Sequence, residues 1–390
     1  MMNIFLTGAS GFLGGELLVE LAKRTDVDRI YCLVRAQSNE AALIRITKVF
    51  NLHNDFFDAK KIIPVVGELT DGNLATQLIG NHQLRDIGTI IHAGANTSFS
   101  KIYDDNVERV NIGGTHQLLK WAQTLGQLKT FTYVGTASIC GTNVKDSLVT
   151  EDMSPDLTAK HLVKYSYTKM IGELMLKDYL PEDKILIVRP SIIMGDSRSW
   201  IPRSCVILWA LATLNHLRMF PINPDSHVDI IPIDYAAHSI IELLFNDHRK
   251  YNVYHISSGR NAATTPGKVL YAIKDSFPGR PDFKFVSKNL WPTMKKWTKN
   301  GMVVDHHNQH YEHRNYLEYW IDHFGDNTKL RILFHALEPY LNFIELGQIF
   351  DNSRLLEDTK LGPSVPAHVY ITNSIKHVDS INIFEGAIDY

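Results

Sequence analysis

The fold is decided by Thr7-Gly8-Ala9-Ser10-Gly11-Phe12-Leu13-Gly14, which follows an apolar run at Asn3–Thr7 and leads into a helical pattern over Gly14–Arg24. Glycines three residues apart allow a tight turn, a close approach of the backbone to a pyrophosphate, and close packing of the helix on the strand. The helix N-terminus adds unpaired N–H groups and a positive dipole end. The stretch therefore predicts a dinucleotide-binding loop, and the alternative is a glycine-rich turn that binds nothing.

Outward from this loop, the first two hundred residues alternate between short apolar runs and longer helical stretches. We expect strands at Asn3–Thr7, Ile30–Val34, Ile62–Val66, Thr89–His92, Thr130–Val134 and Ile185–Val188. The helical stretches between them include Gly14–Arg24, Gly113–Leu125 and Lys164–Lys177. Strands separated by helices form βαβ units, so the pattern predicts an α/β fold with a Rossmann-like, doubly wound parallel sheet.

The rhythm changes after residue 200. An apolar helical segment at Cys205–Leu217 precedes a turn-rich stretch at Pro221–Asp225, and strand-like runs return at Val228–Ile233 and Val253–Ser257. Beyond Gly259 the chain is aromatic and rich in histidine, and it has no clear βαβ pattern. We therefore predict a nucleotide-binding domain from residues 1–200 and 227–258, and a smaller C-terminal substrate-binding region from residues 201–226 and 259–390.

Two arginines bear on which dinucleotide is bound. The second expected strand ends at Val34-Arg35, where proteins that choose NAD carry an acidic residue for the ribose 2′-hydroxyl. An arginine there offers a planar cation that suits a 2′-phosphate. Arg45 follows in an expected helix at Glu40–Val49 and could be a second ligand. These residues favour NADP(H), and the alternative is that both are solvated surface arginines.

Tyr165 and Lys169 form the expected catalytic pair. Their spacing places them on one face of the helix expected at Lys164–Lys177. A cation beside a phenol stabilises the phenolate, so we expect a lowered tyrosine pKa and an acid/base group near neutral pH. The hydroxyl-rich strand end at Tyr133–Ser138 could hydrogen-bond a substrate carbonyl. The alternative is a surface Tyr/Lys pair, because this spacing is common by chance.

These motifs resemble those of the extended, or atypical, short-chain dehydrogenases/reductases. The motifs that carry the resemblance occur in that family's order: Thr7-Gly8-x-x-Gly11-x-x-Gly14, Asn111-Ile112-Gly113-Gly114-Thr115, Tyr165-x-x-x-Lys169 and Arg189-Pro190-Ser191. Within the superfamily, the chain is most similar to thioester reductase domains and fatty acyl-CoA reductases. The narrower resemblance rests on Leu33-Val34-Arg35-Ala36 with Arg45, on Ile91–Phe99, on Val228–Tyr235 and on Val253–Gly259.

The resemblance implies roles for individual residues. It gives Thr136 the catalytic Ser/Thr role beside Tyr165 and Lys169, with Ser138 as the fallback. Cofactor contacts are implied for Gly8, Ser10, Gly11, Phe12, Leu13, Arg35, Arg45, Glu68, Leu69, Ala93, Gly94, Ala95, Pro190, Ser191 and Ile192. The chain departs from the family pattern twice: Glu68 replaces the usual Asp beside the adenine, and Gly135-Thr136 replaces the usual Ser-Thr or Ser-Ser.

The activity implied by the resemblance is NADPH-dependent reduction of an acyl thioester to an aldehyde, with Tyr165 as the acid. The thioester could be an acyl-CoA or a carrier-bound acyl group, and further reduction to the alcohol is left open. Two alternative activities occur in the same superfamily: an NADP-dependent ketone or hydroxysteroid-type dehydrogenase, and a nucleotide-sugar epimerase or dehydratase. A third is a regulator that binds NADP(H) without turnover, although such proteins usually lose the Tyr/Lys pair.

Composition narrows the expected partners and location. The 390 residues carry 40 basic and 42 acidic side chains, so no general field favours nucleic acid. Three scattered cysteines fit a reducing compartment rather than a disulfide scaffold or a zinc site. The N-terminus shows no secretory signal, and the longest uncharged apolar run, Ser204–Leu217, is shorter than a membrane span of ~20 residues. We expect a cytoplasmic protein without a transmembrane segment, and leave peripheral membrane contact and oligomeric state open.

A histidine-rich stretch at Asp305–His313 invites a metal-binding interpretation. His306 and His310 are one helical turn apart, but the H-E-x-x-H motif is absent and the expected reaction needs no metal. A polar helix face or loop is the favoured interpretation, so no metal ion is expected.

Overall fold

A computed structural model describes residues 1–198, 206–300, 311–325 and 327–389. Its centre is a seven-stranded sheet in the order β11-β7-β5-β4-β1-β2-β3, in which every neighbouring pair is parallel. The strands are β1 (Met2–Thr7), β2 (Val27–Val34), β3 (Ile62–Val66), β4 (Thr89–His92), β5 (Thr130–Val134), β7 (Ile185–Pro190) and β11 (Val253–Ile256). The chain starts at β1 and extends the sheet on both sides, so the predicted doubly wound, Rossmann-like α/β fold is confirmed.

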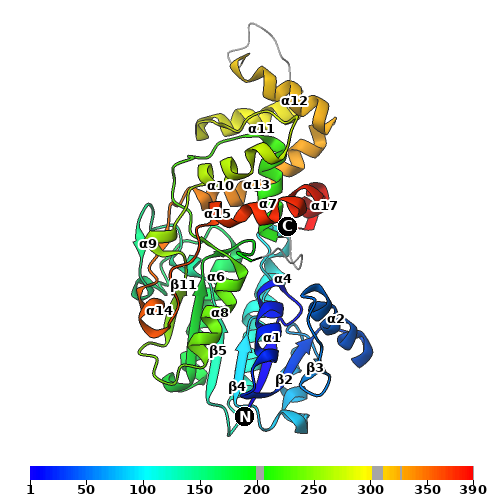
Figure 1. Cartoon of the computed structure of the whole chain (residues 1–390), viewed down its shortest axis with the longest axis vertical. Helices are drawn as coiled ribbons and strands as arrows, with labels where there is room; N and C mark the ends of the chain where they lie inside the picture. The colour runs from blue at the N-terminus through cyan, green and yellow to red at the C-terminus, as the bar shows by residue number, and fades with distance from the viewer. Residues whose placement is uncertain (199–205, 301–310, 326, 390) are drawn as a thin grey trace.

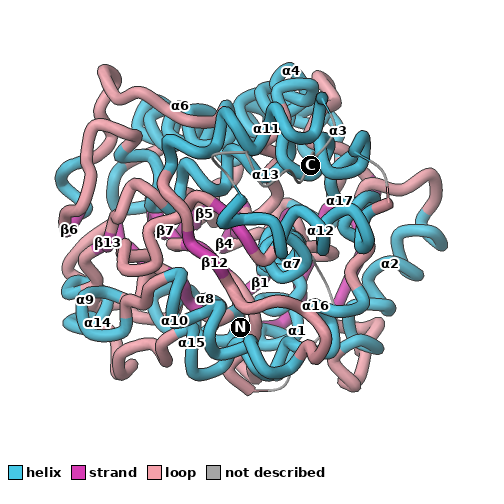
Figure 2. The backbone as a smooth tube through the Cα atoms, turned by 90° about the horizontal axis from the view of Figure 1, so that it is seen from above, coloured by secondary structure: helices cyan, strands magenta, loops and turns pink. Residues whose placement is uncertain are grey.

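Helices cover both faces of this sheet, because its strands are apolar on both sides. One face carries α1 (Phe12–Lys23), α2 (Asn39–Leu52) and α8 (Ile233–Leu244), and the other carries α3 (Leu74–Gly80), α5 (Gly114–Ala122) and α6 (Lys164–Tyr179). Ile4 and Leu6 of β1 pack in the first core, whereas Phe5 between them packs in the second. From above, the strands run between the two helical layers (Figure 2).

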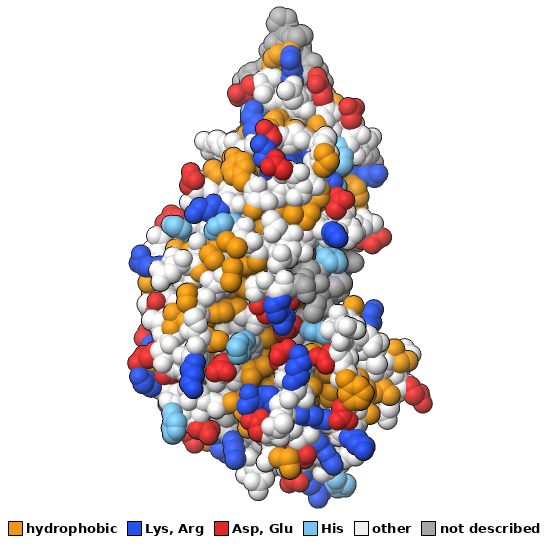
Figure 3. All heavy atoms as spheres, viewed as in Figure 1, with side chains coloured by type: hydrophobic (Ala, Val, Ile, Leu, Met, Phe, Trp, Pro, Cys, Tyr) orange, Lys and Arg blue, Asp and Glu red, His pale blue; other side chains and the backbone are white. Residues whose placement is uncertain are grey.

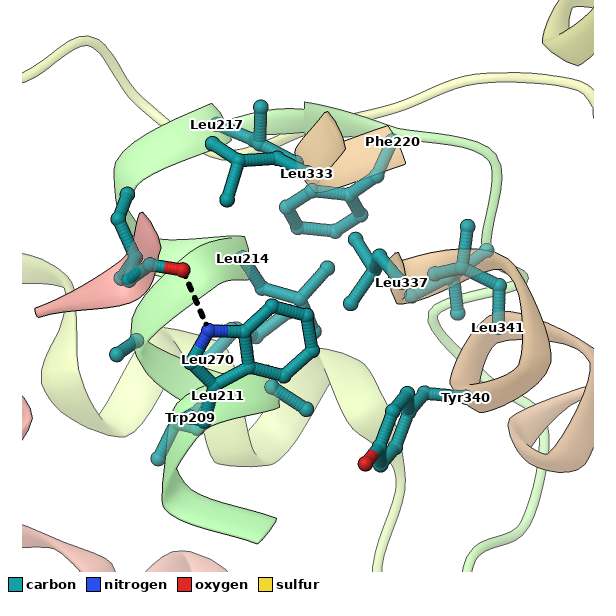
Figure 4. Packing of buried hydrophobic residues seen from close by; sticks show 14 of the residues in the cluster. Trp209, Leu211, Leu214, Leu217, Phe220, Leu270, Leu333, Leu337, Tyr340 and Leu341 are labelled. Carbon is teal, nitrogen blue, oxygen red and sulfur yellow. Dashed lines mark hydrogen bonds between the residues drawn. The ribbon is translucent and has the colours of Figure 1, made fainter. Parts of the chain in front are cut away.

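A second lobe of helices lies above the sheet in Figure 1. It is formed by α7 (Val206–Leu217), α10 (Pro266–Ile273), α11 (Trp291–Asn300), α12 (Arg314–Phe324), α13 (Asn327–Ile344), α15 (Ala367–Tyr370), α16 (Ile375–Ser380) and α17 (Ile383–Asp389). These helices share one hydrophobic core, in which the Trp209 indole donates a hydrogen bond of 2.7 Å to the carbonyl of Ile383. Leu214 of α7 and Leu337 of α13 lie beside this indole (Figure 4).

Short elements join the two parts of the molecule. Two of these are strand pairs, β6 (Leu148–Val149) with β13 (Ile349–Phe350) and β8 (Ile192–Ile193) with β10 (Ile230–Ile231). A third pair, β9 (Met219–Phe220) with β12 (Lys284–Phe285), lies within the second lobe. The other described α-helices are α4 (Asp104–Glu108), α9 (Gly259–Ala262) and α14 (Ser353–Asp358), and a π-helical turn at Arg109–Gly113 precedes α5. Because α14 contacts β11 and α8, residues 349–358 return to the sheet. The division into a nucleotide-binding domain and a substrate-binding region remains a proposal. Residues 349–358, like residues 227–258, would then belong to the nucleotide-binding domain.

Several expected elements have different bounds in the structure. The run at 228–233, expected as a strand, forms only the two-residue β10, because Pro232 offers no N–H to a ladder and instead caps α8. The helix expected at 205–217 is described from Val206 onward, since residues 199–205 lie outside the described residues. The helix expected at 113–125 ends at Ala122.

The surface carries charge of both signs. Lys and Arg side chains alternate with Asp and Glu over the face shown in Figure 3, in keeping with the net charge of −2. Within the described ranges, no helix is both long and apolar enough to cross a membrane.

Candidate functional site

The glycine-rich turn has the geometry that its sequence predicts. β1 ends at Thr7, α1 begins after Gly11, and the Gly11 amide donates a hydrogen bond of 2.8 Å to the carbonyl of Gly8. Gly8 has a φ of +75°, which favours glycine. A Cβ at Gly14 would lie 2.1 Å from the Gly8 oxygen, and one at Gly8 would lie 2.7 Å from the Gly94 nitrogen. The loop is therefore a backbone cradle without side-chain bulk, which fits a pyrophosphate.

A single cavity of about 570 Å³ brings most of the expected site residues together. From the expected cofactor set it is lined by Gly8, Ser10, Gly11, Phe12, Leu13, Ala93, Gly94, Ala95, Pro190, Ser191 and Ile192. Thr136, Tyr165 and Lys169 line it too, as does Ser138. Residues from four parallel strands of the sheet, β1, β4, β5 and β7, or from the turns after them thus meet at one edge of the sheet, where ligands of such folds bind.

Arg35, Arg45, Glu68 and Leu69 do not line this cavity. They lie beside it: the Arg45 guanidinium donates to the Arg35 carbonyl at 2.6 Å and to the Ser10 hydroxyl at 3.3 Å. The exposed Arg35 side chain lies 3.8 Å from a Glu68 carboxylate oxygen. Both arginines are therefore near the phosphate loop, at the end where the expected 2′-phosphate would lie.

Tyr165 stands at the start of α6 and is half-buried. Burial raises the pKa of its phenol to about 12, and a side-chain hydrogen bond with Thr136 partly opposes that rise. The expectation of a lowered pKa is therefore wrong for the protein alone, since the phenol faces the Phe99 ring, 6.3 Å away between centroids. A phenol with this pKa keeps its proton at neutral pH and can act as a hydrogen-bond donor or an acid.

Lys169 lies one turn further along α6 and is 2% exposed. Burial lowers the pKa of its ammonium to about 7, although the carboxylate of Glu173 acts in the opposite direction. Its Nζ atom lies 4.2 Å from the centre of the Tyr133 ring, and the Tyr133 hydroxyl donates to the Lys169 carbonyl at 3.1 Å. Thr136 is also buried, and its hydroxyl oxygen accepts a hydrogen bond of 3.3 Å from the Ser138 amide.

The other half of the cavity was only partly anticipated from the sequence. Three helices of the second lobe each contribute one apolar turn: Ala210, Leu211 and Leu214 from α7, Pro266, Val269 and Leu270 from α10, and Tyr340, Phe343 and Ile344 from α13. Phe99 stacks on both Tyr340 and Phe343, with ring centroids 4.9 and 5.1 Å apart. The helical spacing of these residues was a signal, but apolar spacing alone does not separate a cavity wall from a core.

Neither Cys140 nor the described part of the histidine-rich stretch adds a reactive group to the site. Cys140 is buried and its pKa is raised to about 12 by burial, so its thiolate is not available at neutral pH. Residues 305–310 lie outside the described residues, and Tyr311–His313 form a short 3-10 turn. No cluster of three or more His, Cys, Asp or Glu side chains suited to a metal ion occurs among the residues described.

Gly172 lets the helix of Tyr165 and Lys169 approach the sheet. A Cβ at Gly172 would lie 2.2 Å from the Tyr133 hydroxyl oxygen. Gly172→Ala is therefore expected to destabilise the protein by about 1–3 kcal/mol through overpacking, although alanine is the better helix former. Urea unfolding measures the loss. Gly126→Ala, where nothing lies within 4 Å, is the matched control, and equal stabilities of the two variants would contradict this account.

Comparison with known proteins places these observations in a family. The sequence profile of the male sterility protein family matches residues 6–240, well over half of the chain. A non-canonical nonribosomal peptide synthetase of Aspergillus campestris is 28% identical over 256 residues, which are 62% of this chain and 24% of that protein. Fatty acyl-CoA reductase 1 of Mus musculus is 26% identical over 322 residues, 72% of this chain and 62% of that protein. The chain thus spans less than two thirds of either relative.

A solved structure extends the likeness of fold to almost the whole chain. The terminal R domain from the myxalamid PKS-NRPS biosynthetic pathway superposes with a TM-score of 0.71 at 21% sequence identity. The match covers 97% of this chain and 92% of that domain. The profile match, the relatives and the parallel sheet agree with the motifs of the sequence. The chain therefore belongs to the male sterility protein family, in agreement with the short-chain dehydrogenase/reductase motifs of its sequence.

Proposed function

We propose that this protein is an NADPH-dependent reductase that converts an acyl thioester, on CoA or on a carrier protein, to an aldehyde. The observation that carries the proposal is the shared cavity. The glycine loop, the pair of Tyr165 and Lys169, and an apolar half built by α7, α10 and α13 all line one space of about 570 Å³. The apolar half suits an acyl chain, because each buried methylene contributes about 0.8 kcal/mol.

The residues of this chain would act on the substrate as follows. NADPH, when bound, supplies a hydride for the acyl carbonyl carbon. Tyr165 donates its proton to the carbonyl oxygen as negative charge develops there, and the Thr136 hydroxyl hydrogen-bonds the same oxygen. The hemithioacetal then breaks its carbon–sulfur bond and releases an aldehyde and a thiol. Lys169 would hold the nicotinamide ribose, and the Ala93–Ala95 and Pro190–Ile192 backbones would flank the cofactor.

The function is tested by following NADPH oxidation with acyl-CoA thioesters of increasing length, carrier-bound acyl groups, ketones, aldehydes and nucleotide sugars. We expect turnover with thioesters, rising with acyl length until the apolar half of the cavity is filled. Aldehyde turnover would show that reduction continues to the alcohol. Turnover with ketones alone would replace the proposal by a dehydrogenase, turnover with nucleotide sugars alone by a sugar-modifying enzyme, and tight NADPH binding without any turnover by a regulator.

We also propose that Arg35 and Arg45 select NADPH over NADH. Loss of one charged hydrogen-bond partner for the 2′-phosphate is expected to raise the KM for NADPH about 10- to 100-fold in Arg35→Ala, with the KM for NADH little changed. Steady-state kinetics with both cofactors measure the change in preference. Arg29→Ala, at the opposite end of β2, is the matched control. An unchanged NADPH preference in Arg35→Ala would show that this arginine is only a solvated residue.

A further inference from the structure

Tyr133 contacts both ends of Lys169. It lies on β5, is fully buried, and reaches α6 from the sheet. Its hydroxyl donates to the Lys169 carbonyl at 3.1 Å, and the face of its ring lies 4.2 Å from the Lys169 Nζ atom. The absence of a side chain at Gly172 is what allows this approach, because a Cβ there would collide with the Tyr133 hydroxyl. One aromatic side chain therefore holds the main chain and the ammonium of the same lysine.

The other groups around the Lys169 ammonium give it little compensation. Glu173, on the same helix, is the carboxylate that acts on it, but Glu173 is bound by the Arg189 guanidinium of β7 at 3.0 Å. His92 of β4 is neutral, since burial and the charge of Lys169 hold its pKa well below the ordinary value.

Tyr165 does not supply a negative charge to the lysine either, because its pKa of about 12 keeps it neutral. The ring of Tyr133, 4.2 Å from the Lys169 Nζ atom, is thus a neutral group that favours the charged amine. A cation over an aromatic face is attracted by the ring quadrupole, and this attraction strengthens where water is excluded.

We propose that Tyr133 is a positioning residue that favours the charged form of the Lys169 amine and aims it at the cavity. The proposal rests on the proposed function for the role of Lys169 in turnover, but the contact itself can be tested without any substrate. It predicts that the protonation of Lys169 depends on the electron density of the ring at position 133, and not only on the size of that ring.

The test replaces Tyr133 by phenylalanine and then by mono-, di- and pentafluorinated phenylalanine, which weaken the ring quadrupole with little change of shape. The pKa of Lys169 is read by NMR from lysine labelled at Cε, and its resonance is the one missing in Lys169→Arg. We expect the pKa to fall stepwise by about 0.4–1.5 units from phenylalanine to the pentafluorinated ring. An unchanged pKa along the series would overturn the proposal.

Two controls separate the ring from general effects of fluorine and from loss of the hydroxyl. Phe131 lies two residues back on the same face of β5, and among the described residues its ring makes no cation–π contact with Lys169. Pentafluorophenylalanine in place of Phe131 should therefore leave the pKa of Lys169 unchanged. If Tyr133→Phe does not fold, fluorinated tyrosines at position 133 keep the hydroxyl bond and give the same comparison. A fall in pKa with fluorinated Phe131 as large as that at position 133 would also overturn the proposal.

Activity then tests Lys169 independently. If the charged amine supports thioester reduction, kcat/KM falls as pH rises through the pKa of Lys169, which is about 7. A lower pKa of Lys169 in the fluorinated variants moves the pH at which kcat/KM falls downward by the same number of units. If the pKa measured by NMR shifts but the pH at which kcat/KM falls does not, the contact of Tyr133 with Lys169 is supported. The role given to Lys169 under the proposed function is then contradicted.

Discussion

Tyr165→Phe is expected to lower kcat for thioester reduction by about 10²- to 10⁴-fold and to leave the affinity for NADPH nearly unchanged. The phenol has a pKa of about 12 and therefore holds its proton throughout the physiological range. It can donate that proton as the carbonyl oxygen becomes basic during hydride transfer. Phenylalanine keeps the ring that faces Phe99 and removes only the donor. Steady-state kinetics and a fluorescence titration with NADPH measure the two effects separately.

Tyr167→Phe is the matched control, because Tyr167 lies on the same helix but is exposed and does not line the cavity. It should retain wild-type kcat. If Tyr165→Phe also retains wild-type kcat, the proton comes from another group, and Thr136 is the next hydroxyl on the cavity wall. A loss of NADPH binding in Tyr165→Phe would instead show that the phenol holds the cofactor.

The central fold could be predicted because its signals are local. Each strand of the sheet is a short apolar run, and each glycine of the turn after β1 has a steric reason within a few residues or on the neighbouring strand end. Gly14 is an example, since any side chain there would meet the Gly8 carbonyl. The order of β1, loop and α1 follows from these contacts, and the parallel sheet follows from the alternation of strands and helices.

The protonation states of the site residues could not be predicted from the sequence, because they depend on burial. The sequence places Lys169 one turn from Tyr165 and so suggests a lowered phenol pKa, but sequence spacing contains no information on desolvation. In the structure Lys169 is buried and Tyr165 is half-buried, and burial shifts both pKa values toward the neutral forms. The contact of Tyr133 with Lys169 was missed for the same reason, as it joins two elements 36 residues apart.

The apolar half of the cavity was predicted least well. Its walls come from α7, α10 and α13, which are far apart in the sequence and are brought together only by the packing of the second lobe. Trp209 and Leu214 show the difficulty. Both are apolar residues of one helix, but the indole is fixed in the core by its bond to Ile383 whereas Leu214 also faces the cavity. Helical periodicity places the two residues on different faces of α7, but it does not show which apolar face lines a cavity.

The second large effect is expected from the buried ion pair beneath the site. Arg189 of β7 is 1% exposed and Glu173 of α6 is 3% exposed. The guanidinium donates to the Glu173 carboxylate at 3.0 Å and also to the carbonyls of Glu151 and Ser154, at 2.8 and 3.0 Å. Arg189→Met would leave a carboxylate and two carbonyls buried without this donor. We expect it to lower the free energy of unfolding by about 3–5 kcal/mol.

Urea unfolding of Arg189→Met measures this loss, and two further variants show its origin. Lys250→Met removes one partner of the exposed pair with Glu357 and should leave the unfolding midpoint unchanged. The double variant Arg189→Met/Glu173→Met removes both buried charges, so it should recover part of the stability lost in the single variant. An Arg189→Met protein as stable as Lys250→Met would mean that water reaches Glu173. The ion pair would then not fix α6 on β7, and the position of Tyr165 and Lys169 would depend on the contact of Tyr133 with α6 instead.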